Sequence, residues 1–126
     1  MRDFDDIRLQ KLRVLRQKIF GFFFDVAGQQ KLLEFAMALM TEPKLLLLDE
    51  PTAGINPTLI NGLMHRLKRV NAELGVTLLV IEHNMRVIMN LAEHIYCLAH
   101  GEILAAGTPD AVRNDPRVID AYLGRH

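Results

Sequence analysis

The sequence predicts an α/β fold with parallel strands, and three observations lead to that prediction. Residues 45–48 are an apolar run that ends in two adjacent carboxylates, Asp49 and Glu50. Residues 76–81 are a second short run, rich in β-branched side chains, that is followed closely by His83. Apolar residues between the two runs recur at helical spacing, which gives the order strand, helix, strand. A right-handed crossover makes the strands parallel, so their polar ends should meet at one edge of the sheet.

The first 24 residues have the pattern of a basic, amphipathic helix. We favour a helix that packs its apolar side against the core of the protein, and a surface for membrane lipid or a partner helix is the alternative. If nothing covers the aromatic rings of residues 22–24, they would form an adhesive patch. The apolar positions on one face are Leu9, Leu12, Ile19, Phe20 and Phe23, and the basic ones are Arg8, Lys11, Arg13 and Lys18.

The elements from residue 32 to residue 83 follow from periodicity and from helix-ending residues. A helix over 32–40 should end at the Thr-Glu-Pro sequence of 41–43. The four leucines of 45–48 then suit a strand buried on both faces of a parallel sheet. A helix over about 59–74 should end at Gly75, where glycine provides the usual C-cap.

The carboxyl-terminal elements are predicted by capping residues and by one turn. Asn84 can cap a helix that extends to about Glu93. Residues 95–99 and 102–106 should form a β-hairpin around a glycine turn. Two short helices should complete the chain, because the sequences Thr108-Pro109 and Asp115-Pro116 each place an N-cap before a proline at the first helical position.

The carboxylates after the first strand point to nucleotide hydrolysis. One of them can hold the Mg²⁺ of a nucleotide, usually through water, while the other orients or deprotonates the attacking water. His83, at the same sheet edge, can hydrogen-bond a terminal phosphate and that water. Taken alone, residues 45–50 are equally consistent with an apolar segment and a solvated acidic turn. The full run through Pro57 favours the nucleotide site strongly.

Four motifs in order then resemble the carboxyl-terminal half of an ATP-binding cassette (ABC) ATPase. They are Gly28-Gln29-Gln30, residues 45–50, residues 51–57 and residues 81–83. The resemblance implies a partial P-loop NTPase core with ATP and Mg²⁺ as cofactors. It places the signature loop at Asp25–Gln30, the Walker B aspartate at Asp49, the catalytic glutamate at Glu50, the D-loop at Ala53–Asn56 and the switch histidine at His83. Gly28, Gln29 and Gln30 would then contact nucleotide together with Asp49.

The tail narrows the resemblance to one kind of transporter. Residues 107–124 are similar to the end of the ATP-binding subunit of branched-chain amino-acid importers. This implies three segments: a divergent helical part (1–24), the carboxyl-terminal half of the ATPase domain (25–107) and an importer-type helical tail (108–126). The tail also disfavours a third class, the cassette ATPases of nucleic-acid repair or translation.

The sequence departs from the family in two places. None of its eight glycines is followed by lysine, so it contains no Gly-x-x-x-x-Gly-Lys loop to cradle phosphates. Val26 and Ala27 stand where the family often has serine and glycine, and Val26 offers no hydroxyl. We therefore expect the chain alone to bind ATP weakly and not to hydrolyse it. A non-catalytic interaction protein, which docks on a cassette or a permease without turnover, is the alternative function.

Composition limits the partners and the compartment. Fifteen basic and fifteen acidic residues give no net charge and no argument for nucleic acid. The single cysteine, Cys97, excludes an internal disulfide and fits a reducing compartment. No apolar run has the roughly 20 residues that span a bilayer. The resemblance implies a cytoplasmic protein, peripheral to the inner face of the cell membrane through permease subunits and a second cassette subunit. An uncovered sheet edge and face also predict a homo-oligomer, with Phe22–Phe24 in or near the contact.

Overall fold

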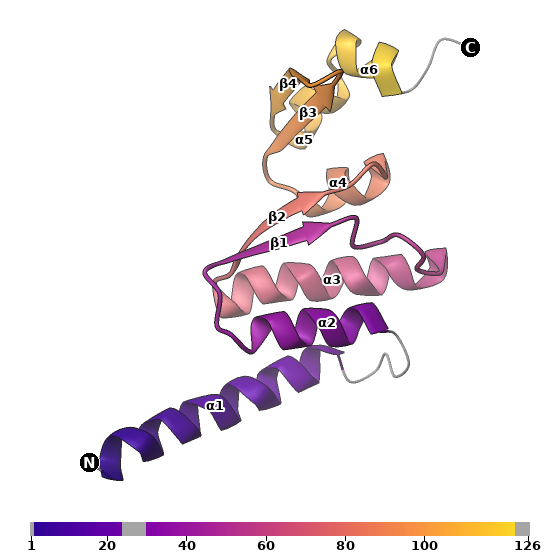
Figure 1. The fold of residues 1–126 in the computed structure, drawn as a ribbon. Helices are drawn as coiled ribbons and strands as arrows, with labels where there is room; N and C mark the ends of the chain where they lie inside the picture. Colours follow the sequence, from indigo (N-terminus) through magenta and orange to yellow (C-terminus); the bar gives the residue numbers. More distant parts are fainter. Residues whose placement is uncertain (1, 24–29, 123–126) are drawn as a thin grey trace. The chain divides into compact units, whose positions relative to one another are not determined.

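The computed structural model describes residues 2–23 and 30–122 of the chain, and in the first helix it describes the side chains of residues 9–19. The chain divides into two compact units. The first comprises residues 1–51 and 65–81, and the second comprises residues 52–64 and 82–126. Both units mix helices and strands (Figure 1), so the α/β class predicted from the sequence is confirmed.

The first unit contains a parallel pair of strands, β1 (Leu45–Asp49) and β2 (Thr77–Ile81). They are joined through α3 (Pro57–Leu74), whose residues from 65 onward belong to this unit. The register pairs Leu45 with Thr77 and Asp49 with Ile81, as the predicted strand, helix, strand order requires. The first unit also holds α1 (Arg2–Phe23), which packs against α2 (Gln30–Leu39).

The end of α3 is fixed to the start of β2 by hydrogen bonds around Gly75. The Gly75 amide donates to the carbonyl of Asn71 (3.1 Å), and Gly75 has a φ of 67°. The Asn71 side chain donates to the Val76 carbonyl (2.9 Å), and the Thr77 amide donates to the Lys44 carbonyl (2.9 Å). The predicted glycine C-cap is thus confirmed, and it sets where β2 begins.

The core of the first unit lies on one face of the β1–β2 pair. Each helix and strand of the unit contributes buried apolar side chains, except that for β2 the buried residue is Val76, directly before the strand. These side chains are Ile19, Leu32, Leu39, Leu46, Leu48, Leu67, Val70 and Val76. For α1, Ile19 is buried, but Leu9, Leu12 and Val14 are exposed, so the favoured packing holds only for part of the helix.

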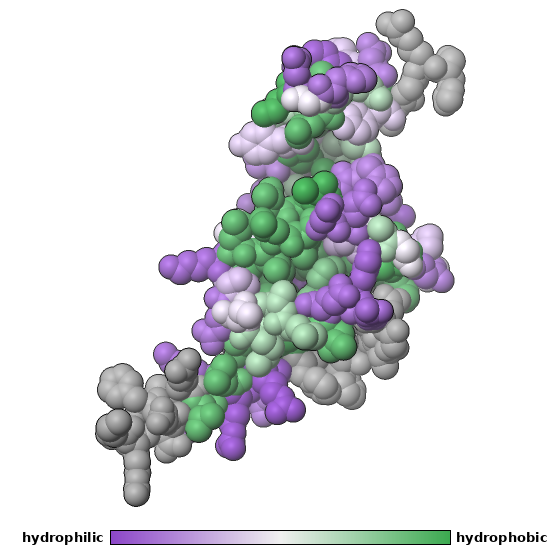
Figure 2. All heavy atoms as spheres, in the orientation of Figure 1, coloured by the Kyte–Doolittle hydropathy of each residue, from purple (hydrophilic) through white to green (hydrophobic). Residues whose placement is uncertain are grey.

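The opposite face of the pair is open, so the prediction that part of an apolar face is uncovered is confirmed, and the expected strand buried on both faces is wrong. Leu45 is 52% exposed, Leu47 65%, Leu79 54% and Ile81 61%. Leu45 and Leu47 alternate with the buried Leu46 and Leu48, because neighbouring side chains of a strand point to opposite faces. Figure 2 shows the resulting apolar patch over these strands. Four consecutive leucines give no sign of which face is covered.

The second unit is built on an antiparallel hairpin of β3 (Ile95–Ala99) and β4 (Glu102–Gly107). His100 and Gly101, which connect the strands, have φ angles of 52° and 79°. Two positive φ angles are typical of the tight turns that match the twist of a hairpin. The hairpin, α4 (Met85–Leu91), α5 (Pro109–Arg113) and α6 (Pro116–Tyr122) bury one cluster. Its buried members are Ile95, Cys97, Ala105, Val112 and Val118, against which Met85, Ile88, Met89 and Ala92 pack.

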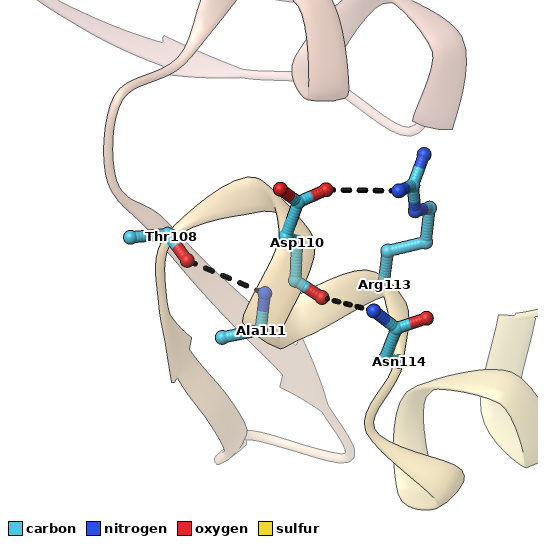
Figure 3. A network of polar contacts seen from close by, with 5 residues as sticks. All are labelled: Thr108, Asp110, Ala111, Arg113 and Asn114. Carbon is cyan, nitrogen blue, oxygen red and sulfur yellow. Dashed lines mark hydrogen bonds and ion pairs between the residues drawn. The ribbon is translucent and has the colours of Figure 1, made fainter.

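The helix caps of the second unit follow the sequence closely. In α5 the Thr108 hydroxyl accepts from the Ala111 amide (3.3 Å), Asp110 pairs with Arg113 (2.8 Å), and the Asn114 side chain donates to the Asp110 carbonyl (2.9 Å) (Figure 3). At the start of α6, Asp115 pairs with Arg117 at 2.7 Å. The hydroxyl of Tyr122, at the end of α6, donates to the Leu98 carbonyl (2.5 Å) and so fastens this helix to β3.

Over residues 2–23 and 30–122, no helix combines the length and the apolar composition needed to cross a membrane.

Candidate functional site

Asp49 and Glu50 stand where β1 ends. Asp49 is the last residue of the strand, is exposed and lies opposite Ile81. The Glu50 amide donates a 2.8 Å hydrogen bond to the Ile81 carbonyl, which extends the pairing of the strands by one residue. The two carboxylates therefore occupy the carboxyl end of a parallel strand, where α/β proteins place ligand-binding groups.

The backbone of Glu50 is strained. Its φ of 46° lies in the left-handed region, which side chains other than glycine rarely adopt. Such a conformation costs on the order of 1–3 kcal/mol and persists where neighbouring contacts enforce it. Here the bond to Ile81 holds the Glu50 amide, and the Lys31 ammonium donates to its carbonyl (3.2 Å). The direction of the chain changes sharply at Glu50, directly after the strand.

The loop after Glu50 leads into α3 through Thr52 and Asn56. Pro51 is fully buried, and Thr52 is 8% exposed. The Ile55 amide donates to the Thr52 carbonyl (3.2 Å), and Gly54 has a φ of 72°. The side-chain oxygen of Asn56 accepts from the amide (3.1 Å) and the hydroxyl (3.0 Å) of Thr58 at the start of α3. The segment predicted as the D-loop is thus a compact turn.

Glu82, which precedes His83, accepts three hydrogen bonds within the second unit. One oxygen of its carboxylate accepts from the Thr52 amide (2.9 Å) and from the Thr52 hydroxyl through a short bond. The other oxygen accepts from the Asn84 amide (3.3 Å). We call this arrangement of Glu82, Thr52 and Asn84 the Glu82 clasp.

The clasp keeps Glu82 ionised. Burial of the half-buried carboxyl raises its pKa, but the hydrogen bonds from Thr52 and Asn84 and the nearby His83 lower it by more. The net result is a pKa below the ordinary glutamate value, because all of these donors stabilise the charged form. Glu82 is therefore a carboxylate at neutral pH.

His83 lies between two residues of the clasp and is exposed. The next residue, Asn84, is the N-cap of α4, and its side-chain oxygen accepts from the Val87 amide (3.4 Å). The predicted N-cap is confirmed. His83 thus belongs to the second unit, whereas Asp49 and Glu50 belong to the first.

Of the remaining predicted site residues, the structure describes Gln30 alone. Gly28 and Gln29 are outside the described residues, as are Phe24 and the residues from Asp25 to Ala27. Gln30 is the first residue of α2 and is exposed. The structure therefore describes Asp49, Glu50, His83 and Gln30 among the predicted contacts to nucleotide.

The donors at Asp49 suit magnesium better than a metal held entirely by protein. Among the residues that the structure describes, no group of three or more histidine, cysteine, aspartate or glutamate side chains could hold a metal ion. Mg²⁺ is commonly bound by one or two carboxylates together with substrate phosphates and water. A single exposed Asp49 fits that requirement.

Sequence reasoning missed Thr52 and Glu82. Thr52 is part of the Pro-Thr turn after the carboxylates, and Glu82 precedes His83, so both lie inside recognised motifs. Nothing in the spacing of the sequence indicates that side chains thirty residues apart bond to each other.

Comparisons with known proteins agree with the motifs. Residues 26–53 match the model of the ABC transporter family, and residues 102–126 match that of the branched-chain amino acid ATP-binding cassette transporter. The high-affinity branched-chain amino acid transport ATP-binding protein BraF of Pseudomonas aeruginosa is 45% identical over 97 residues. That match covers 77% of this chain and 38% of BraF.

Solved structures show the same relationship. The ADP conformation of MJ1267, an ATP-binding cassette of an ABC transporter, superposes with a TM-score of 0.75 at 32% identity, over 91% of this chain and 51% of that one. The dimeric post-hydrolysis structure of the ATP-binding cassette MJ0796 bound to ADP and Pi matches with a TM-score of 0.58 at 32% identity, over 65% of this chain and 35% of that one. The chain thus spans between about a third and a half of the length of these proteins. These findings identify it as the carboxyl-terminal part of an ABC transporter ATP-binding protein of the branched-chain amino acid type.

Proposed function

We propose that the chain supplies the water-activating side of the ATP site in the ATP-binding subunit of an ABC importer for branched-chain amino acids or related solutes. The observation that carries this proposal is the pairing of β1 with β2. It holds Asp49 and Glu50 side by side at the carboxyl end of a parallel strand, with the Glu50 amide bonded to Ile81. The similarity to BraF supports the solute class.

In this proposal each residue has one task. Asp49 holds Mg²⁺ through a bridging water, and Glu50 accepts a hydrogen bond from the attacking water and orients it. When bound, Mg²⁺ neutralises charge on the phosphates of ATP. His83 donates or accepts a hydrogen bond at the terminal phosphate and the water. The strained Glu50 backbone supports a functional role, because such strain is concentrated at active sites.

The phosphate cradle has to come from another stretch of polypeptide. This sequence contains no Gly-x-x-x-x-Gly-Lys motif, and it covers 38% of BraF. Backbone amides of such a loop normally supply many of the contacts to the β- and γ-phosphates. We therefore propose that Gly28, Gln29 and Gln30, together with Asp49, add contacts to a nucleotide that is held mainly elsewhere.

ABC cassettes form dimers and complexes with permeases, and MJ0796 was solved as a dimer. By analogy, we propose a second cassette subunit and membrane permease subunits as the partners of this chain. The location would be the cytoplasmic face of the cell membrane, with attachment through the permease.

A chimaeric cassette tests the proposal. The part of BraF that precedes its match to this chain would be joined to residues 25–126, and phosphate release from Mg-ATP would be measured. We expect turnover that is lost in the Glu50→Gln form of the same chimaera. A folded chimaera that binds ATP and releases no phosphate would instead favour the non-catalytic interaction protein.

A further inference from the structure

We infer that Glu82 is a positioning residue for His83. Its carboxylate binds both Thr52 and the amide of Asn84, so the residues before and after the histidine are both held in place. This inference rests on the proposed function, in which His83 contacts the terminal phosphate, because it gives Glu82 the role of holding His83. The clasp itself lies entirely within the second unit.

The geometry uses the whole carboxylate. Three donors reach its two oxygens: the Thr52 amide at 2.9 Å, the Thr52 hydroxyl, and the Asn84 amide at 3.3 Å. A glutamine at position 82 would have one acceptor oxygen and one NH₂ group. The NH₂ group would face the amide of Asn84 or the donors of Thr52, and two donors cannot form a hydrogen bond with each other. The site is therefore specific for a carboxylate.

Because Thr52 is buried, its hydrogen bonds to Glu82 are important for holding both side chains in place. Thr52 is the buried polar residue in the described part of the chain, and its hydroxyl has little access to water. A buried hydroxyl that loses its partner retains its desolvation penalty, so Thr52 and Glu82 hold each other in place. Charge assistance shortens and strengthens these bonds relative to neutral ones.

The consequence for His83 follows from its position in the chain. Glu82, before it, is fixed through its side chain to Thr52. Asn84, after it, donates its amide to Glu82 and caps α4 through its side chain. With both neighbours held, the φ and ψ angles of His83 have little freedom, so the direction of its Cα–Cβ bond is set before any ligand arrives.

Two substitutions that preserve charge separate positioning from electrostatics. Thr52→Val removes the hydroxyl while keeping the size and the branching of the side chain, and Thr52→Ser keeps the hydroxyl. Neither changes the charge next to His83, whereas Glu82→Gln removes it. Glu93→Gln, at an exposed residue just after α4, is the control for the loss of one negative charge.

The test uses nuclear magnetic resonance on the full 126-residue chain without nucleotide. We expect Thr52→Val and Glu82→Gln to shift the His83 imidazole carbon-bound protons and to lower the order parameter of the His83 amide. Thr52→Ser and Glu93→Gln should leave both near their original values. In Glu82→Gln the Thr52 amide should also exchange with solvent roughly tenfold faster. Methyl signals of Val112 and Val118, which lie in the core of the second unit, report whether each variant is folded.

The inference is overturned if His83 keeps its shifts and its order parameter in a folded Thr52→Val variant. It is also overturned if Thr52→Ser disturbs His83 as strongly as Thr52→Val does. If Glu82→Gln does not fold, the comparison of the two Thr52 variants decides alone. Because no hydrolysis is measured, a failure of the proposed ATPase function in the chimaera would leave this result unaffected.

Discussion

The amide of Glu50 donates a 2.8 Å hydrogen bond to the carbonyl of Ile81, one residue beyond the point where β1 ends. This bond links the carboxylate-bearing turn to the end of the neighbouring parallel strand. It also helps to hold Glu50 at a φ of 46°. The position of the proposed water-orienting carboxylate is thus set by the sheet and does not depend on a mobile surface loop.

The isolated chain should show no ATPase activity and only weak affinity for nucleotide. The reason is the missing phosphate loop beside an intact Asp49-Glu50 pair. Titration of the purified protein with Mg-ATP should give no micromolar binding isotherm. Phosphate release should not exceed that of a Glu50→Gln control. Tight binding, or turnover that depends on Glu50, would reveal a phosphate cradle that the sequence does not disclose.

In the completed chimaeric cassette, Glu50→Gln should abolish turnover and leave ATP binding intact. The substitution removes the carboxylate that polarises water and leaves the phosphate contacts in place. A loss of roughly 10²–10⁴-fold in kcat is expected for a general base or a water-orienting group. His83→Ala should also impair kcat severely. Near-normal hydrolysis in both variants would show that these residues do not carry the mechanism.

The Glu82 clasp should make the stability of the second unit depend on pH. The folded pKa of Glu82 is lowered, so its stabilising effect is fully present above the unfolded pKa of about 4.3 and is lost as the pH falls through the folded value. Glu82→Gln should therefore lower the free energy of unfolding by about 1–3 kcal/mol at pH 7. That difference from the original protein should shrink steadily below about pH 4.

Urea unfolding followed by tyrosine fluorescence measures this difference, because both tyrosines, Tyr96 and Tyr122, belong to the second unit. The unfolding is measured at pH 7 and at pH 3. Glu93→Gln serves as the charge-matched control and should unfold like the original protein at both pH values. A Glu82→Gln difference that stays constant between pH 7 and pH 3 would contradict the assignment.

Leu67→Ala and Leu47→Ala should differ sharply in their effect on stability. Leu67 is 1% exposed and lies on α3 in the core of the first unit, so its truncation leaves a cavity that costs about 2–5 kcal/mol. Leu47 lies on the open face of β1, and its truncation in the monomer should cost about 0.5 kcal/mol or less. Thermal unfolding followed by circular dichroism of the helices compares the two. The comparison is made on monomeric protein, and equal losses there would mean that the monomer covers this face itself.

The sequence predicted most elements because their signals are local. Apolar spacing located α3, and capping residues located α4 and α5 through Asn84 and Thr108. The prediction that β1 is buried on both faces was wrong, because burial depends on what packs on each face and a run of leucines is the same in either case. The open apolar face was predicted correctly, because it followed from the neighbouring strands that the sequence lacks. The contact between Thr52 and Glu82 was missed because it depends on the tertiary fold across thirty residues.

The open face of the β1–β2 pair should drive self-association of the isolated chain. Leu45, Leu47, Leu79 and Ile81 form a contiguous apolar patch on neighbouring strands (Figure 2). Removing roughly a few hundred Å² of such surface from water stabilises a complex at about 25 cal/mol per Å². That gain competes with the entropy lost on association, so we expect a dimer or higher assembly.

Sedimentation at micromolar concentration, with one double variant and one control, tests this prediction. Leu47 and Leu79 are register partners, so replacing both with lysine places two like charges opposite each other and should give a monomer. Met37→Lys changes an exposed apolar residue on α2, away from the patch, and should leave the assembly intact. Phe22 and Phe23, whose side chains the structure does not describe, and Phe24, which lies outside the described residues, remain predicted members of the contact. A protein that stays monomeric at these concentrations and binds no hydrophobic dye would show that the apolar face does not recruit a second copy.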